Sequence, residues 1–91
     1  MKYELIFTDS AMKKLDSYKK SNPTAFKKII RLMPELENHP RTGTGHPEPL
    51  IKGNNITYSR RITAKDRLIY NINDTSVTVI IVTVGGHYDD K

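Results

Sequence analysis

The sequence predicts an α+β domain in which two N-terminal helices pack on one face of a mostly antiparallel sheet. Three observations support this fold class. An alternating apolar segment comes first, two segments with apolar residues at helical spacing follow, and three strand-like segments complete the chain. The order β-α-α-β-β-β is typical of a two-layer α+β architecture. A chain of 91 residues forms one domain, spanning residues 1–91, with a modest core.

The two helices have clear start signals. In residues 2–7, the first expected strand, Tyr3, Leu5 and Phe7 share one face. Thr8 then provides the N-cap of a helix over residues 9–21. Asn22-Pro23 marks the start of a second helix, in which Pro34 predicts either a kink or an early end. The apolar faces of the helices are expected to be Ala11, Met12, Leu15 and Tyr18 in the first, and Phe26, Ile29, Ile30, Met33 and Leu36 in the second.

Residues 38–55 are rich in Gly, Pro and Asn and predict a long loop. Strands are expected over residues 56–62, 67–72 and 77–84. The last of these is an almost unbroken β-branched run, which is typical of a central strand buried on both faces.

Side-chain alternation in these strands separates the arginines. Arg60 has the core-facing parity of its strand, and we expect it to form a structural ion pair. Ser59, Arg61 and Arg67 fall on the sheet face away from the helices, and this polar face is the expected site.

The composition narrows the class of partner. Lys and Arg number 15 against 10 Asp and Glu, a net charge of +5, which favours a polyanion: nucleic acid first, then an acidic membrane surface or protein. No apolar run approaches the ~18 residues of a membrane span. Cysteine is absent and no secretory pattern opens the chain, so we expect a cytoplasmic protein without disulfides. We expect no metal or cofactor, because HExxH, Asp-rich and Gly-rich phosphate-binding motifs are all absent.

Glu48 is the strongest candidate for a catalytic residue. Pro47 and Pro49 flank it and restrict the backbone, so its carboxylate is held in a rigid setting. Together with the arginines and with His87, it completes the set of groups needed for acid–base chemistry on a phosphodiester. The structural alternatives are a Glu48–lysine surface pair, an Arg67 salt bridge to Asp66 or Asp74, and an inert terminal His87.

Several motifs resemble one known family. The segments GHPEPL (45–50), YSRRI (58–62) and RLIY (67–70), followed by His87-Tyr88, are similar to the Txe/YoeB family of toxins from toxin–antitoxin systems, within the RelE-like superfamily. The resemblance covers nearly the whole chain. It implies a RelE-like microbial ribonuclease fold and a ribosome-dependent mRNA endonuclease. It also implies a homodimer that is neutralised by a Phd/YefM-type antitoxin.

The resemblance also assigns roles to residues. Glu48 matches the general base, Arg67 the transition-state arginine and His87 the general acid of metal-free RNA cleavage. Arg61 and Tyr88 match positions that contact the mRNA. Lys52 is the third expected RNA contact, although the family's lysine directly follows PEPL and Ile51 stands there in this chain. Two other readings stay open: a non-catalytic nucleic-acid-binding module, and an interaction partner that acts with an antitoxin as co-repressor.

Overall fold

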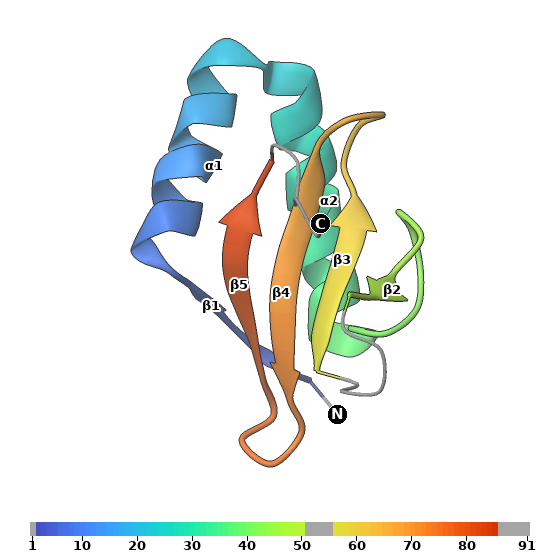
Figure 1. The fold of residues 1–91 in the computed structure, drawn as a ribbon. Coiled ribbons are helices and arrows are strands. Elements are labelled where there is room, and N and C mark those ends of the chain that lie inside the picture. The colour runs from blue at the N-terminus through green and yellow to red at the C-terminus, as the bar shows by residue number, and fades with distance from the viewer. Residues whose placement is uncertain (1, 51–55, 86–91) are drawn as a thin grey trace.

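The structure, a computed structural model, describes residues 2–50 and 56–85 and consists of a sheet with two helices packed on one face (Figure 1). The elements are β1 (Glu4–Phe7), α1 (Asp9–Ser21), α2 (Pro23–Asn38), β2 (Glu48–Pro49), β3 (Thr57–Arg61), β4 (Arg67–Asn73) and β5 (Thr78–Val84). The strands lie in the order β1-β5-β4-β3-β2. Only the pairing of β1 with β5 is parallel among these strands, so the expected two-layer α+β fold with a mostly antiparallel sheet is confirmed.

Both helices begin at the residues that the sequence indicates. The Thr8 side chain accepts a hydrogen bond from the Ala11 amide at 3.1 Å, and the Asn22 side chain accepts one from the Ala25 amide at 3.2 Å. These bonds satisfy amides that have no partner inside the helix. The expected N-caps are therefore confirmed.

The second helix does not end early at Pro34, and that alternative is wrong. α2 continues to Asn38, whose side-chain amide donates to the Pro34 carbonyl at 2.8 Å. Leu36, fully buried, anchors the last turn in the core. The Glu37 carbonyl accepts a hydrogen bond from the Tyr3 amide at 2.7 Å, which ties the same turn to the segment before β1. Tertiary contacts thus hold the helix together beyond the proline.

The buried stripe of α2 is rotated from the expected one. Ile29 and Leu36 are buried as expected, but Ile30 is 45% exposed and Leu32 takes its place in the core. The buried positions Ala25, Ile29, Leu32 and Leu36 follow a spacing of four, three and four residues. In α1, Met12 is likewise exposed, whereas Ala11 is fully buried.

The central position of β5 is confirmed, but its burial on both faces is not. Val79, Ile81 and Val84 are fully buried, whereas Ile80 and Val82 are only half-buried. The helices cover one face of the sheet (Figure 1), which explains why Val79, Ile81 and Val84 are more deeply buried than Ile80 and Val82.

The expected loop contains a short strand that the sequence does not predict. β2 pairs antiparallel with β3, so that Glu48 lies opposite Ser59 and Pro49 opposite Tyr58. The Leu50 amide extends the pairing by donating to the Thr57 carbonyl at 2.9 Å. Pro49 is tolerated because β2 is the edge strand, where one amide can be missing. Glu48 is therefore held by the sheet as well as by its flanking prolines.

Candidate active site

Strand register brings Glu48 and the arginines onto one face of the sheet. Directly paired residues of neighbouring strands place their side chains on the same face. One such row runs from β2 to β5 through Glu48, Ser59, Ile69 and Thr83. The next row along β3 and β4 pairs Arg61 with Arg67. The acid and both arginines assigned to the site thus lie within two adjacent rows.

Glu48 and Arg67 form an ion pair. An Arg67 guanidinium nitrogen lies 3.7 Å from Glu48 Oε1, and the side chains are 35% and 60% exposed, respectively. Arg67 therefore pairs with the candidate base rather than with Asp74, which is bound by Arg41 at 2.9 Å. A pair at this distance and exposure contributes at most about 1 kcal/mol to stability. It can open readily when a substrate competes for either partner.

Arg61 lies directly opposite Arg67 and is exposed, as expected for a phosphate contact. Two guanidinium groups in adjacent cross-strand positions repel each other, and an anion between them removes that repulsion. With Glu48 these side chains carry a net charge of +1. The arrangement suits a phosphodiester better than a neutral ligand.

Three of the candidate residues, His87, Tyr88 and Lys52, lie outside the described residues. The structure does describe Gly85, whose amide donates to the Arg67 carbonyl at 2.7 Å. The chain therefore leaves the described region beside Arg67, two residues before His87 in the sequence.

Ser59 differs from expectation. It belongs to the site face, but its side chain is fully buried, and its Oγ has no hydrogen-bond partner within the described part of the chain. Alternation identifies the face of a sheet on which a residue lies, and it says nothing about the side chains that cover that residue.

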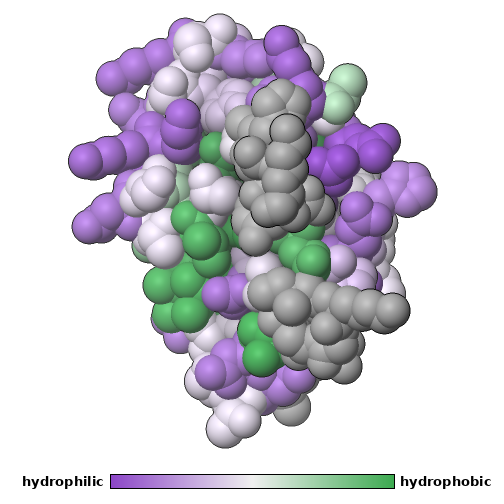
Figure 2. Space-filling view, in the orientation of Figure 1, coloured by the Kyte–Doolittle hydropathy of each residue, from purple (hydrophilic) through white to green (hydrophobic). Residues whose placement is uncertain are grey.

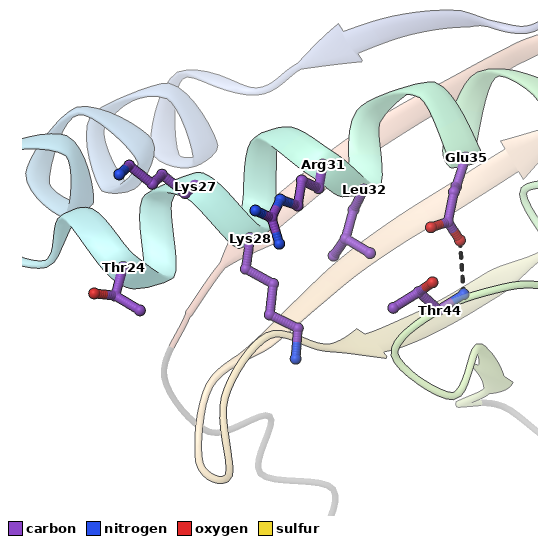
Figure 3. Close-up of a pocket in the computed structure, with 7 residues that line it drawn as sticks. All are labelled: Thr24, Lys27, Lys28, Arg31, Leu32, Glu35 and Thr44. Atoms are coloured by element: carbon purple, nitrogen blue, oxygen red, sulfur yellow. Dashed lines mark hydrogen bonds between the residues drawn. The ribbon is translucent and has the colours of Figure 1, made fainter.

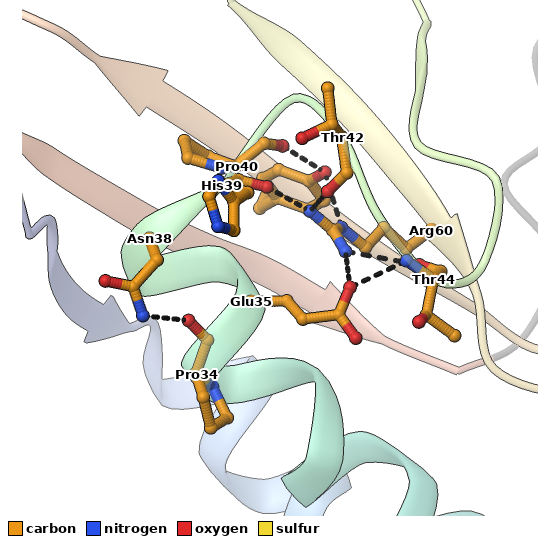
Figure 4. A network of polar contacts seen from close by, with 9 residues as sticks. Pro34, Glu35, Asn38, His39, Pro40, Thr42, Thr44 and Arg60 are labelled. Atoms are coloured by element: carbon orange, nitrogen blue, oxygen red, sulfur yellow. Dashed lines mark hydrogen bonds and ion pairs between the residues drawn. The ribbon is translucent and has the colours of Figure 1, made fainter.

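The expected structural ion pair of Arg60 is confirmed. Its guanidinium is fully buried and lies 3.0 Å from Glu35 Oε1 (Figure 4). The pKa of the Glu35 carboxyl is lowered overall. Burial, the largest single effect, raises it, but hydrogen bonds from Thr44 and Arg60 together outweigh burial. The charges of both groups are thus accommodated at the end of α2.

Arg60 also fastens the segment that leads to β2. Its guanidinium donates to the carbonyls of His39, Thr42 and Thr44 at 2.5, 2.6 and 3.2 Å. Tyr70, whose pKa is raised by burial, accepts from Arg60 and donates to the Pro40 carbonyl. These contacts fix the path of the chain between α2 and the candidate base.

Gly45 makes the last attachment before β2. Its carbonyl accepts a hydrogen bond from the Arg61 amide at 2.6 Å, and its backbone φ is +86°. A Cβ at this position would lie 2.7 Å from the Arg61 carbonyl oxygen. Only glycine fits such a conformation and such a close approach without strain.

A separate basic groove runs along α2 (Figure 3). Its volume is about 550 Å³, and it is lined by Thr24, Lys27, Lys28, Arg31, Leu32, Glu35 and Thr44. Glu35, the carboxylate among them, is bound by the Thr44 amide and by Arg60. The groove suits an anionic group, but its one carboxylate is already bound by the Thr44 amide and Arg60, unlike the exposed Glu48. Within residues 2–50 and 56–85, no three His, Cys, Asp or Glu side chains are grouped so as to hold a metal ion.

Comparison with known proteins identifies the family. The sequence pattern of the YoeB-like toxin of bacterial type II toxin–antitoxin systems matches residues 7–88. The chain therefore belongs to this family. None of the described helices is long and apolar enough to cross a membrane.

Individual relatives agree with this assignment. Toxin YoeB of Escherichia coli is 30% identical over 76 residues, which cover 84% of this chain and 90% of the relative. Toxin RelK of Mycobacterium tuberculosis is 39% identical over 54 residues, 59% of this chain and 64% of that protein's length. One chain of the YoeB dimer from Staphylococcus aureus superposes on this chain with a TM-score of 0.82 and 26% identity. A chain of the YoeB–YefM complex from the same organism superposes with a TM-score of 0.78 and 27% identity, and each match covers 97% of this chain and 100% of the other.

Proposed function

We propose that this toxin is an endoribonuclease that cleaves mRNA in the ribosomal A site without a metal ion. The observation that carries this proposal is the contact between Glu48 and Arg67 on the sheet face, with Arg61 opposite Arg67. A carboxylate beside two guanidinium groups combines a proton acceptor with stabilisation of phosphoryl charge. Membership of the toxin family supports RNA as the substrate.

The chemistry follows from these groups. Glu48 takes the proton of a ribose 2′-hydroxyl, and the 2′-oxygen attacks the adjacent phosphorus. Arg67 and Arg61 stabilise the charge that develops on the phosphoryl oxygens. His87 protonates the departing 5′-oxygen as its bond to phosphorus breaks. The products are a 2′,3′-cyclic phosphate and a 5′-hydroxyl, and Tyr88 and Lys52 hold the mRNA.

The proposal extends to partners. A homodimer and a Phd/YefM-type antitoxin are supported by the likeness to the YoeB dimer and the YoeB–YefM complex of Staphylococcus aureus. The net charge of +5 suits association with ribosomal and messenger RNA in the cytoplasm.

Primer extension on an mRNA in a purified translation system tests the proposal. Wild type should create new 5′ ends within A-site codons, and only when ribosomes are present. Glu48→Gln and His87→Gln should each lower the cleavage rate by about 10²- to 10⁴-fold, because each removes one proton transfer. Glu4→Gln, an exposed glutamate in β1, is the matched control and should cleave as wild type does.

Three results would contradict the proposal. Cleavage by both variants at the wild-type rate would mean that Glu48 and His87 are not the acid–base pair. Cleavage of an mRNA with a 2′-deoxy nucleotide at the cut site would exclude attack by the 2′-hydroxyl. Absence of cleavage by folded wild type would favour an interaction partner of the antitoxin instead.

A further inference from the structure

Ser59 lies beside the ion pair of the candidate site in the strand register. Arg67 belongs to β4 and Glu48 to β2, and β3 separates these two strands. Their ion pair must therefore pass over β3. Ser59 is the β3 residue paired with Glu48, and Arg61 is the β3 residue paired with Arg67, so the ion pair crosses β3 between Ser59 and Arg61.

The Ser59 hydroxyl is unusual in this position. It is fully buried and makes no hydrogen bond to any described residue. Buried polar groups nearly always have a partner, because an unpaired one loses its bonds to water without replacement. An alanine would fill the same strand position without this cost.

Glu48 is the acceptor closest in register to this hydroxyl. Cross-strand partners have Cβ atoms about 5 Å apart, a separation that a serine hydroxyl and a glutamate carboxylate can bridge by side-chain rotation. Ile69, the next residue of the row, has no donor, and Thr83 lies on β5, two strands away from Ser59. Ser59 is thus the hydroxyl of this row adjacent to Glu48.

We propose that Ser59 is a positioning residue for Glu48, holding its carboxylate when Arg67 turns from Glu48 to the scissile phosphate. This role rests on the proposed nuclease function, because it requires Glu48 to act as the base. In the free protein Arg67 restrains the carboxylate through the 3.7 Å ion pair. Once the phosphate binds Arg67 in place of Glu48, the Ser59 hydroxyl donates to the Glu48 carboxylate and keeps it oriented toward the 2′-hydroxyl.

Ser59→Ala distinguishes this role from simple packing. If the hydroxyl only packs, its removal relieves an unsatisfied buried group, and both stability and cleavage are retained or improved. If it positions Glu48, stability is retained or improved while the reaction slows. The proposal therefore predicts that Ser59→Ala lowers the cleavage rate without lowering the stability of the protein.

Thr57→Val is the matched control. Thr57 lies two residues away on the same strand and face, and its hydroxyl donates to Asn71 Oδ1 at 2.8 Å. Its removal should lower the thermal unfolding midpoint and leave cleavage at the wild-type rate. Ser59→Ala should therefore lower activity without lowering stability, whereas Thr57→Val should lower stability without lowering activity.

The experiment is single-turnover mRNA cleavage on programmed ribosomes over a range of toxin concentrations, with thermal unfolding of each variant. For Ser59→Ala we expect a maximal rate lowered by about 10- to 100-fold, which corresponds to the loss of one hydrogen bond to a charged group. The half-saturating toxin concentration should be unchanged, and the unfolding midpoint unchanged or higher.

Two results would overturn the positioning role alone while wild type remains active: a Ser59→Ala variant with the wild-type maximal rate, or one in which only the half-saturating concentration changes. Folded wild type that fails to cleave would overturn the proposed nuclease function, and this role with it. Comparing wild type with Ser59→Ala in one assay separates these cases.

Discussion

At the scale of single residues, Arg60 has the most contacts that bear on the site. One guanidinium makes five hydrogen bonds, to Tyr70, Glu35 and three loop carbonyls. Carbonyl groups at the end of a helix and in the following loop need donors, and a buried arginine can supply several at once. The Glu35 carboxylate balances the charge that this arrangement buries.

Glu35→Gln should lower the free energy of unfolding at neutral pH by about 2 kcal/mol, because Arg60 then stays buried without a counter-charge. The pKa of Glu35 is lowered in the folded state from an ordinary value of 4.5. Its stabilisation is therefore full above pH 4.5 and is lost as the pH falls through the lower, folded-state pKa. Urea unfolding of both proteins between neutral and acid pH measures this difference.

Glu37→Gln is the control for that comparison. Glu37 pairs with Lys2 at 3.6 Å, and the Lys2 side chain is 69% exposed, so its loss should cost well under 1 kcal/mol. A difference between wild type and Glu35→Gln that stays constant from neutral to acid pH would contradict the assigned role of the carboxylate.

At the scale of elements, α2 shows a helix that tolerates an internal proline. Pro34 has no amide to donate to the carbonyl of Ile30, four residues earlier, and its ring crowds that carbonyl. Pro34 itself is exposed, so its ring is not required to fill the core. The local cost of the proline is offset by burial of Leu32 and Leu36 on either side.

Pro34→Ala should raise the stability of the protein by about 1 to 3 kcal/mol, because it restores one helical hydrogen bond and removes the steric conflict. The urea midpoint of unfolding measures this change. Pro23→Ala is the matched control, because a proline in the first turn replaces no helical hydrogen bond and its removal should change little. A Pro34→Ala variant that is less stable than wild type would show that the proline ring is itself stabilising.

Element prediction from the sequence was strong where local signals are strong. Thr8 and Asn22-Pro23 mark the helix starts directly, and alternation separates Arg60 from Arg61 and Arg67. β2 was missed because a strand of two residues shows no periodicity; only its pairing with β3 defines it. Leu32 rather than Ile30 is buried in the core. This rotation of the buried stripe of α2 depends on how the helix packs against the sheet.

The residues of the candidate site were likewise predicted from the sequence only in part. Strand alternation put Arg61 and Arg67 on one face, and Glu48 was chosen by its flanking prolines in an expected loop; the structure brings these three together. The burial of Ser59 depends on the side chains that cover it, and no spacing in the sequence encodes these. The roles of His87, Tyr88 and Lys52 stay predictions.

At the scale of the whole molecule, charge is the dominant property. The net charge of +5 is spread over 91 residues, and the basic groove of α2 lies on a different layer from Glu48. A positive surface of this kind attracts RNA at long range and orients the encounter.

The half-saturating toxin concentration on programmed ribosomes should therefore rise on the order of tenfold or more between about 50 and 200 mM KCl, because bound counterions are released from RNA phosphates. The magnesium concentration stays fixed in this titration. Thermal unfolding in the same buffers controls for salt effects on the fold. A half-saturating concentration that does not change with salt would show that charge contributes little to the association.

The strand order has a consequence for the synthesis of this toxin. β5 lies between β1 and β4, so the N-terminal strand joins the other strands of the described sheet through β5. β1 has no strand neighbour in the described sheet until residues 78–84 have left the ribosome. A nascent chain can pair β2, β3 and β4, which carry Glu48 and Arg67, before β5 is available, but it cannot attach β1 until then. The five-stranded sheet is therefore completed by the pairing of β1 and β5, its most distant segments in the sequence.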